Sequence, residues 1–579
     1  MSGPSPVLVR ISGALAEAEP LGEASLYELV RVGHKGLLGE VIRVVGLRAT
    51  IQVYEETSGL CVGEPVTLTG QSLTVQLGPG LLGSVLDGVG RPLARVALET
   101  GDFVHPGAAA ATLDETSKWS FTPLVPVGTS VRGGDVLGTV LEREGFEHRV
   151  LVPPTVSGIV AALERGTYTV NEPLGRLTDG TPLTLSHAWP VREPRPIGRR
   201  LPLGAPLVTG QRVFDFLFPV AEGGSVAVPG GFGTGKTVIE QSLAKYADAD
   251  VVVYVGCGER GNEMAEVLEE FPKLIDHRSG KPVMDRTVLV VNTSNMPVAA
   301  REASVYLGVT VAEYYRDMGY RVALMADSLS RWAEALREIG ARLQEMPGEE
   351  GYPTYLGNRL GKFYERAGRV RAAGTPEREG ALTVIGAISP PGGDFSEPVT
   401  QAALRVVGAL WALDPALAHQ RQFPAVDWET SYSLYSDVTE AWFAKSAGAD
   451  WTELRSATLE LLQRDRELRE IAELVGPEAL VDADRLLLEA ARMIRETVLG
   501  QSAHDPNDAS STLDKTYRLV GAALAVYRAG QRALAAGKTF EQLDLATPRR
   551  LLAMVRRASS DEVPSRAADA RSSAEALAA

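Results

Sequence analysis

Residues 225–245, SVAVPGGFGTGKTVIEQSLAK, place a glycine-rich loop between a short apolar segment and a helix-forming segment. The loop matches the pattern G-x-x-x-x-G-K-[ST], which predicts a phosphate-binding loop when it joins a strand to a helix. Glycine at positions 230, 233 and 235 lets the backbone turn successive N–H groups toward phosphate oxygens. A glycine-rich turn with a chance Lys-Thr is the alternative, and the flanking strand and helix disfavour it. We therefore expect this chain to bind a nucleoside triphosphate.

The types of residue in this loop assign expected roles within it. The Lys236 ammonium is expected to reach the β- and γ-phosphates, and the Thr237 hydroxyl is expected to ligate Mg²⁺. The helix that begins near Lys236 adds the positive end of its dipole. The predicted ligands are therefore ATP or ADP with Mg²⁺, and the predicted contacts within the loop are Gly230, Gly231, Phe232, Gly233, Thr234, Gly235, Lys236, Thr237 and Val238.

Around this loop, residues 196–430 alternate apolar strands with helical stretches. The strands, at 251–255, 287–291, 322–326 and 382–388, are apolar throughout and show no alternation. Such runs are typical of a parallel sheet that is covered on both faces. Helices are expected at 298–317 and 330–345. We predict an α/β nucleotide-binding domain with the loop at the edge of the sheet where ligands bind.

Two acidic residues follow predicted strands of this domain. Glu259 and Arg260 come after VVVYVGCG, and Asp327 comes after RVALMA. An acid after an apolar strand can hold Mg²⁺ directly or through water. Glu259 is the candidate for polarising an attacking water, and Arg260 for neutralising charge on the transferred phosphoryl group. Taken singly, each acid could instead be solvated at a strand end.

The regions on either side of the α/β domain have different patterns. Residues 1–75 contain short β-branched strands with frequent turns, which predict a small β-barrel. Residues 76–195 form a connector with an inserted β module at about 115–188, which resembles carrier domains but has no lysine in its hairpin. Residues 431–579 show apolar positions at three- and four-residue spacing, which predict a helical domain. The tail after about Ser559 is expected to be frayed.

Composition limits the possible classes of protein. The chain has 579 residues, with 73 acidic and 58 basic side chains and a net charge of −15, which argues against a nucleic-acid partner. Its two cysteines are too few for a disulfide framework. No apolar run approaches the roughly 18 residues of a membrane span. Any membrane role is therefore expected to be indirect.

Several motifs together resemble the catalytic A subunits of V/A-type rotary ATPases. They are GGFGTGKT, VGCGERGNEM, NTSNMPVAAREAS, ADSLSRWAEALRE, SPPGGDFSEPVTQ and FPAVDW. The resemblance covers nearly the whole chain and is weakest in about the first 25 and last 60 residues. It implies a multidomain protein with an N-terminal β-barrel carrying an inserted β module, a central P-loop α/β domain and a C-terminal helical domain.

The resemblance also implies roles for individual residues. Glu259 would orient the lytic water, Arg260 would contact the γ-phosphate, and Asp327 would support the metal. Arg331 would belong to the network around the switch region. Phe423 would stack on adenine, although it could instead be an aromatic residue of the core. Family members often have a second adenine contact in a segment that here reads QSAHDP, so His504 is the candidate for that contact.

The activity and partners implied by the family extend beyond this chain. Three A subunits would alternate with three non-catalytic B subunits, each of which supplies an arginine finger in trans. ATP turnover would be coupled to a central rotor, a peripheral stalk and H⁺ or Na⁺ transport, with the complex on the cytoplasmic side of a membrane. The alternatives are a Rho-like hexameric RNA-dependent ATPase and a nucleotide-binding structural subunit without turnover. The absence of an aromatic-basic platform for single strands disfavours the first, and the presence of Lys236 and Glu259 disfavours the second.

Overall fold

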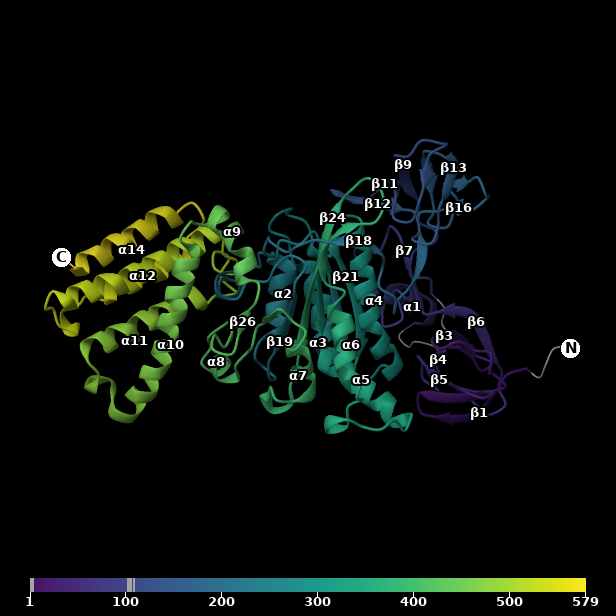
Figure 1. Cartoon of the computed structure of the whole chain (residues 1–579), viewed down its shortest axis with the longest axis horizontal. Helices are drawn as coiled ribbons and strands as arrows, with labels where there is room; N and C mark the ends of the chain where they lie inside the picture. Colours follow the sequence, from purple (N-terminus) through teal and green to yellow (C-terminus); the bar gives the residue numbers. More distant parts are fainter. Residues whose placement is uncertain (1–4, 102–106, 108–109, 579) are drawn as a thin grey trace. The chain divides into compact units, whose positions relative to one another are not determined.

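The computed structural model describes residues 5–101, 107 and 110–578, and their helices and strands are labelled in Figure 1. The chain forms two compact units. Unit 1 contains Met1–Pro202, Ala249–Pro390 and Phe395–Val406, and unit 2 contains Leu203–Asp248, Pro391–Asp394 and Val407–Ala579. The stretch predicted as one nucleotide-binding domain, residues 196–430, thus contributes to both units.

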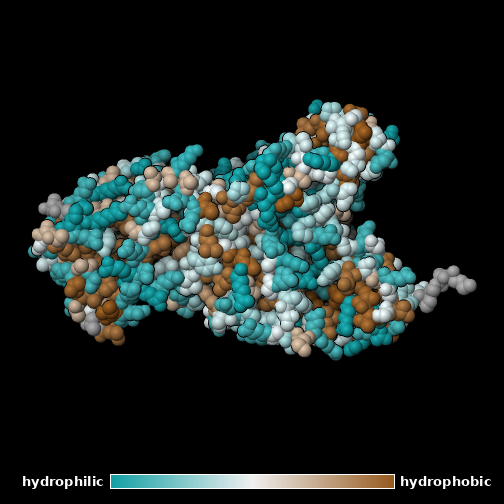
Figure 2. Space-filling view, viewed as in Figure 1, coloured by the Kyte–Doolittle hydropathy of each residue, from teal (hydrophilic) through white to brown (hydrophobic). Residues whose placement is uncertain are grey.

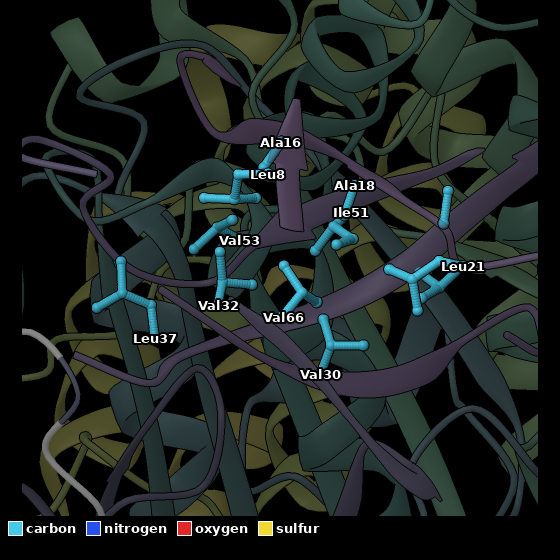
Figure 3. Packing of buried hydrophobic residues seen from close by; sticks show 12 residues of the cluster. Leu8, Ala16, Ala18, Leu21, Val30, Val32, Leu37, Ile51, Val53 and Val66 are labelled. Atoms are coloured by element: carbon cyan, nitrogen blue, oxygen red, sulfur yellow. The ribbon is translucent and has the colours of Figure 1, made fainter. Parts of the chain in front are cut away.

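Unit 1 begins with an antiparallel β-barrel. Its strands, in spatial order, are β1 (Val7–Ser12), β2 (Leu15–Glu19), β5 (Arg48–Val53), β4 (Leu37–Val45), β3 (Glu28–Val32) and β6 (Val66–Ser72). A bridge between Val7 and Pro65 joins β1 to the residues just before β6. Val30 and Val32 are both fully buried, because alternate side chains of a strand point to one face. Together with Leu8, Ile51 and their neighbours they form the apolar core shown in Figure 3.

The inserted module consists of two small antiparallel sheets. One has the order β10 (Ser130–Val131), β13 (Gly158–Leu163), β15 (Gly175–Leu177) and β16 (Pro182–Leu183); the other has β12 (Phe146–Leu151), β11 (Val136–Arg143), β9 (Trp119–Pro123) and β14 (Gly166–Tyr168). Phe121, Leu137 and Val152 are fully buried in its own core. After the module, β17 (His187–Pro190) pairs with β7 (Thr74–Leu77), so the chain returns beside the strand from which it left.

A parallel sheet forms the centre of unit 1. Its strands, in order, are β24 (Glu379–Ile388), β22 (Arg321–Asp327), β20 (Val251–Glu259), β21 (Thr287–Thr293) and β8 (Val85–Asp87), and β23 (Gly368–Ala372) and β18 (Ile197–Arg200) continue it in antiparallel fashion. The four strands predicted from apolar runs are confirmed. Strand β8 was missed, because it is three residues long within a glycine-rich connector.

Helices cover this sheet, as Figure 1 shows for α4. Helix α4 spans Val298–Asp317, as predicted, and nearly all of its side chains are buried. Helix α5 spans Leu329–Arg342 and ends three residues before the predicted boundary, because Gln344 adopts a left-handed conformation at φ 56°. The other helices of unit 1 are α1 (Leu93–Thr100), α3 (Gly261–Glu270), α6 (Leu356–Tyr364) and α7 (Pro398–Leu404).

Unit 2 contains the glycine-rich loop and a helical domain. Strand β19 (Ser225–Pro229) is parallel to β25 (Ala409–Leu410), which pairs with β26 (Tyr432–Ser433). The loop leads into α2 (Lys236–Tyr246), and the short α8 (Pro415–His419) follows β25. The remaining helices are α9 (Ser436–Ser446), α10 (Trp451–Val475), α11 (Asp482–Ile494), α12 (Leu513–Ala535), α13 (Ala546–Arg557) and α14 (Val563–Ala578). The predicted fold class, with barrel, inserted module, α/β region and helical C-terminal domain, is confirmed.

The expectation of a frayed tail after Ser559 is wrong. The tail forms α14, which packs on α12 and buries Ala567, Ala570 and Ala574. Alanines at three- and four-residue spacing give a narrow apolar face on a strongly helix-forming segment. Gly521 on α12 leaves room for the Arg571 guanidinium, since a Cβ there would lie 2.5 Å from its Nη2 atom.

The turn between α10 and α11 exposes apolar side chains. Leu474 is 86% exposed and Val481 65% exposed, and Ile471 is also exposed. Figure 2 shows this apolar surface at the end of the helical domain. Exposed apolar clusters of this kind are typical of contact surfaces for partners. Within the described residues, no helix is both long enough and apolar enough to cross a membrane.

Candidate nucleotide-binding site

The glycine-rich loop has the backbone conformation that a phosphate cradle requires. Gly233 and Gly235 have positive φ values of 78° and 87°, in the left-handed region that only glycine adopts without strain. A Cβ built on Gly233 would meet no atom within 4 Å, so the space beside it is open. Gly235 is the N-cap of α2, and the N–H groups of the first turn of α2 are the donors that bind anions at helix N-termini.

Gly230 is needed for a different reason from the one predicted. Its φ is not among the positive values, so backbone freedom does not explain the glycine. A Cβ at this position would lie 2.7 Å from Thr234 Oγ1 and 2.8 Å from Leu413 Cβ. The glycine therefore permits close packing of the loop against Leu413, which lies three residues after the end of β25. Thr234 in turn donates a hydrogen bond from Oγ1 to the Gly231 carbonyl at 2.8 Å, which fixes the loop from inside.

Lys236 and Thr237 begin α2 and provide the loop's polar side chains. The Lys236 ammonium donates to the carbonyl oxygens of Gly230 at 2.6 Å and Gly231 at 3.0 Å, so it lies folded over the loop. Thr237 is partly exposed, and among the described residues its hydroxyl makes no side-chain hydrogen bond. Such a hydroxyl is open to an outside ligand. Phe232 and Val238 are exposed beside these residues, at 80% and 50%.

Phe423, predicted to stack on adenine, lies against the start of α2. Its ring carbon Cε1 is 3.5 Å from the Cβ position of Gly235, and the side chain is 42% exposed. An aromatic ring with one open face beside a phosphate loop can stack on a base. An aromatic residue of the core would be less exposed than Phe423 is.

His504 is not placed as a comparable stacking residue. It lies exposed in the loop that follows α11, and it makes no ring contact, hydrogen bond or ion pair with the rest of the described chain. Gln501 of the same loop has the closer connection. Its main-chain N–H donates to the Phe423 carbonyl at 2.8 Å, and its buried side chain donates to Gly210 at 2.9 Å and accepts from the Arg212 N–H at 2.9 Å.

A buried ion-pair network holds this loop. Arg212 Nη2 is 2.7 Å from Asp508 Oδ1, and both side chains are fully buried. Arg556 of α13 donates to the other oxygen of Asp508 at 2.8 Å, and the Ser502 N–H donates to that same oxygen at 2.8 Å. The segment QSAHDP indicated the loop, but the residues that anchor it, Arg212, Asp508 and Arg556, lie far apart in sequence. These anchoring residues can be identified only from the structure, in which they contact one another.

In unit 1, the carboxyl ends of β20 and β22 bring two acids together. The two strands are parallel neighbours, and Gly256 of β20 pairs with Asp327 of β22. Asp327 is 4% exposed, and Glu259 is partly buried. Gly258 has φ 73°, and a Cβ there would lie 2.7 Å from Arg331 Cβ. Gly258 thus lets the end of β20 approach α5 closely.

The surroundings of Glu259 favour its protonated form. Burial raises its pKa from the usual 4.5 to about 7, and the neighbouring charges of Asp327 and Glu263 add to that shift, while the Ser328 hydroxyl opposes it. A carboxyl group with a pKa near neutral pH can accept and release a proton under physiological conditions. Such perturbed acids are typical of functional sites.

The two arginines near these acids are held differently. Arg260 is exposed at the N-cap of α3, and its Nε lies 4.0 Å from Glu263 Oε1. Arg331 on α5 forms a bidentate pair with Glu334 at 2.9 and 3.0 Å, which raises its pKa. Glu259 also contributes to that rise in the Arg331 pKa.

The side chains present fit a hard divalent cation. Mg²⁺ prefers oxygen ligands and is usually held by one or two protein groups together with substrate phosphates. Within unit 1, the carboxylate of Asp327 is a donor of this kind. The electrostatic repulsion between Asp327 and Glu259 is of the sort that a bound cation relieves.

Sequence models of four protein families match successive parts of the chain. The beta-barrel domain of the ATP synthase alpha/beta family matches residues 8–70, and the alpha/beta subunit barrel-sandwich domain matches 110–192. The nucleotide-binding domain of the ATP synthase alpha/beta family matches 210–433. The C-terminal domain of V and A type ATP synthase matches 440–543.

Close relatives cover nearly the full chain. The V-type ATP synthase alpha chain of Anaeromyxobacter dehalogenans (strain 2CP-1) is 57% identical over 100% of this chain and 99% of its own. The V-type alpha chain of Thermoanaerobacter pseudethanolicus is 55% identical over 93% and 92%, and the A subunit of the A-type ATP synthase of Methanopyrus kandleri is 56% identical over 93% and 91%. Among solved structures, the assembled ATPase EscN of an enteropathogenic E. coli type III secretion system has a TM-score of 0.63 at 21% identity, covering 90% of this chain and 100% of that one, which shows a shared fold.

Proposed function

The chain belongs to the family formed by the alpha chains of V-type and the A subunits of A-type ATP synthases, and from that premise we propose that it is the catalytic subunit of a rotary ATPase. In this role it interconverts ATP with ADP and phosphate, and that turnover is coupled to ion transport through other subunits. The observation that carries the proposal is the loop of residues 230–237, with its left-handed glycines, open space and cation at the start of α2.

Binding of the triphosphate is assigned to the loop and α2. The main-chain N–H groups of the loop and the first turn of α2 donate to the phosphates, and Lys236 leaves the Gly230 and Gly231 carbonyls to pair with them. Thr237 and Asp327 would hold Mg²⁺, which neutralises phosphate charge when bound. Phe423 stacks on the base, and Gln501 fixes the main chain beside it.

Glu259 is proposed to position the attacking water and to take its proton. A pKa of about 7 leaves a substantial fraction of this carboxyl ionised at neutral pH, so it can act as a base and return the proton in the reverse direction. Arg260, exposed beside it, would meet the charge that develops on the γ-phosphoryl group. Arg331, held by Glu334, contributes positive charge behind Glu259.

Partners complete the proposed function. A neighbouring B subunit would supply an arginine finger, a group worth about 10³–10⁵ in rate, so the isolated chain should turn over slowly. The alternating hexamer would surround a central rotor and be held by a peripheral stalk, on the cytoplasmic side of a membrane. The apolar turn at Leu474 and Val481 is suited to contact with such a rotor.

The alternatives receive less support. A Rho-like RNA-dependent ATPase is not favoured, because relatives that match the full chain at more than half identity are ATP synthase subunits. A structural subunit without turnover would need no acid with a raised pKa beside Asp327, and Glu259 provides one.

The test is Glu259→Gln in the assembled complex. Glutamine keeps the shape of the side chain but cannot take a proton, so we expect turnover to fall by about 10²–10⁴ while nucleotide affinity is retained. Steady-state hydrolysis and equilibrium binding of a fluorescent ADP analogue measure the two quantities. In membrane vesicles, ATP-driven ion uptake and gradient-driven ATP formation should both disappear.

The matched control is Glu269→Gln, which changes an exposed acid on α3, the short helix that follows Glu259 in the chain. It should leave hydrolysis, binding and ion transport as in the wild type. Unchanged turnover in Glu259→Gln would contradict the assignment of the water-positioning residue. Loss of nucleotide binding in that variant would show instead that Glu259 maintains the structure of the site.

A further inference from the structure

A second cavity lies within unit 1, and none of its lining residues belongs to the nucleotide site described above. Its volume is about 920 Å³, within the range of sites for nucleotide-sized ligands. Four parts of the chain line it: Tyr27 of the barrel, residues 192–200, helix α4, and the stretch of chain that begins at α6. Arginine and lysine side chains outnumber carboxylates in this lining, in a chain whose net charge is −15.

On one wall of this basic cavity, the charge of Arg192 is neutralised and its side chain is held in place. Arg192 pairs with Glu40 at 2.8 Å and with Glu302 at 2.7 Å. Its guanidinium carbon lies 5.1 Å from the ring centroids of both Tyr27 and Tyr306. Two carboxylates and two aromatic faces saturate this cation, so it shapes the cavity and is not available to a ligand.

In a second group of charged side chains at the cavity, arginines outnumber the carboxylates that pair with them. Among the described residues, Arg195, Arg316 and Arg366 share two carboxylates, Glu313 and Asp317. Arg366 is 5% exposed, and its Nε–H has no hydrogen-bond partner in the described part of the chain. A buried donor without a partner is costly, and a ligand that offers an acceptor oxygen relieves that cost.

Three further cations have no carboxylate partner at all among the described residues. Arg359 on α6 donates only to tyrosine hydroxyls, at 3.0 Å to Tyr27 and 3.4 Å to Tyr306. Lys362, one turn further along α6, is exposed and forms no ion pair with the described chain. Arg200 on β18 donates only to main-chain carbonyls. These side chains can all turn toward an anion.

We propose that this cavity binds a small molecule carrying two or more phosphate groups. Several separate cations around one cavity match several charges on one ligand, and arginine pairs with phosphate through parallel hydrogen bonds. Tyr27 and Tyr306 add hydroxyl groups and aromatic faces. A single carboxylate would satisfy one cation and leave the others uncompensated. An apolar ligand would leave all of these cations uncompensated.

Calorimetric titration of the full-length Lys236→Ala chain tests the proposal, because this background weakens phosphate binding at the glycine-rich loop. Inorganic tripolyphosphate and ADP are the two probes. We expect saturable binding of at least one of them, with an affinity that falls about tenfold or more when Arg359→Ala and Lys362→Ala are added. Tighter binding of ADP would identify a nucleotide as the ligand, and tighter binding of tripolyphosphate would identify a polyphosphate.

The control is Arg405→Ala, which removes an exposed cation of unit 1 outside the cavity and should leave both affinities unchanged. Lys362→Glu guards against misfolding of the double variant, since this exposed side chain can change without disturbing the core, and it should weaken binding as well. Absence of binding by both probes, or equal affinities with and without Arg359 and Lys362, overturns the proposal. Neither result bears on turnover at the glycine-rich loop.

Discussion

The end of strand β20 and the seam between the inserted module and α4 each hold a buried carboxyl group, but under opposite conditions. Glu259, at the end of β20, has the carboxyl groups of Asp327 and Glu263 as neighbours, and burial with their charge raises its pKa to about 7. Glu142, at the seam, accepts hydrogen bonds from the N–H groups of Gly80 at 2.7 Å and Leu82 at 3.0 Å, and lies 2.6 Å from His148 Nδ1.

The consequence for Glu142 is a lowered pKa. Burial alone would raise it, but the His148 imidazole and the two N–H donors outweigh burial and hold the pKa below 4.5. His148 is in turn fixed by the Tyr314 hydroxyl at 2.9 Å, so the carboxylate joins the module to α4. A carboxylate surrounded by donors stabilises a fold, whereas one surrounded by other acids is ready to exchange a proton. This contrast separates structural from functional acids within one unit.

The largest expected effect is that of Glu142→Ala. Removal of the carboxylate leaves two N–H groups and an imidazole nitrogen buried without their acceptor, which costs about 3–5 kcal/mol. Amide hydrogen exchange in strands β11 and β12 and in residues 80–82 should therefore accelerate by about two to three orders of magnitude.

The matched control for this prediction is Glu144→Ala. Its side chain is 89% exposed and lies 3.5 Å from Lys281 Nζ, so its removal should leave exchange nearly unchanged. If Glu142→Ala exchanged no faster than Glu144→Ala, the seam would not be held by this carboxylate. Glu142 would then not be a structural acid that contrasts with Glu259.

Glu259→Gln should stabilise the protein, and only at high pH. The folded-state pKa of about 7 exceeds the usual 4.5, so the native state holds the proton more tightly than the unfolded chain does. Stability contributed by this group therefore decreases as pH rises from about 4.5 to 7. Glutamine does not ionise, so the variant does not lose this stability as pH rises. Its free energy of unfolding should exceed that of the wild type by about 1–3 kcal/mol at pH 8 and by nearly nothing at pH 4.5.

Thermal unfolding of the nucleotide-free chain at pH 5 and pH 8 measures this difference. We expect the Tm of the variant to exceed that of the wild type by more at pH 8 than at pH 5. An equal difference at both pH values would show that the Glu259 pKa is not raised in the folded chain. A variant Tm below that of the wild type at pH 8 would show that Glu259 is paired as Glu142 is. Glu266→Gln, an exposed change on α3, should show no pH-dependent difference.

The sequence was most informative where function depends on residues close together along the chain. The loop at 230–237, the strand ends at Glu259 and Asp327, and the full extent of α4 could all be predicted, because each is encoded by a local pattern of glycines, acids or apolar runs. The roles of single loop residues were harder to predict. Gly230 looked like a conformational glycine, but it is a packing glycine whose neighbour, Leu413, is distant in sequence.

What could not be predicted depends on contacts between distant segments. His504 was selected as an adenine contact by its residue type, whereas Gln501 is the residue bonded to Phe423, through its main chain. The α14 tail looked unstructured because its composition is alanine-rich and charged, but α12 supplies the surface that orders it. Likewise, nothing local marks Glu142 as structural, because its donors come from residues 80–82 and from the next strand of the module.

The smallest expected effect separates the causes of the raised Glu259 pKa. Burial is the largest cause and Asp327 the next, whereas Glu263 contributes through a hydrogen bond and its charge. Glu263→Gln removes that charge, so the Glu259 pKa should fall by about half a unit. The acidic limb of the kcat/KM profile of the assembled complex, which reports ionisation of the free enzyme, should move to lower pH by the same amount. Glu266→Gln should not move it. An acidic limb that does not move would contradict this prediction, and burial and Asp327 would then account for the raised Glu259 pKa without Glu263.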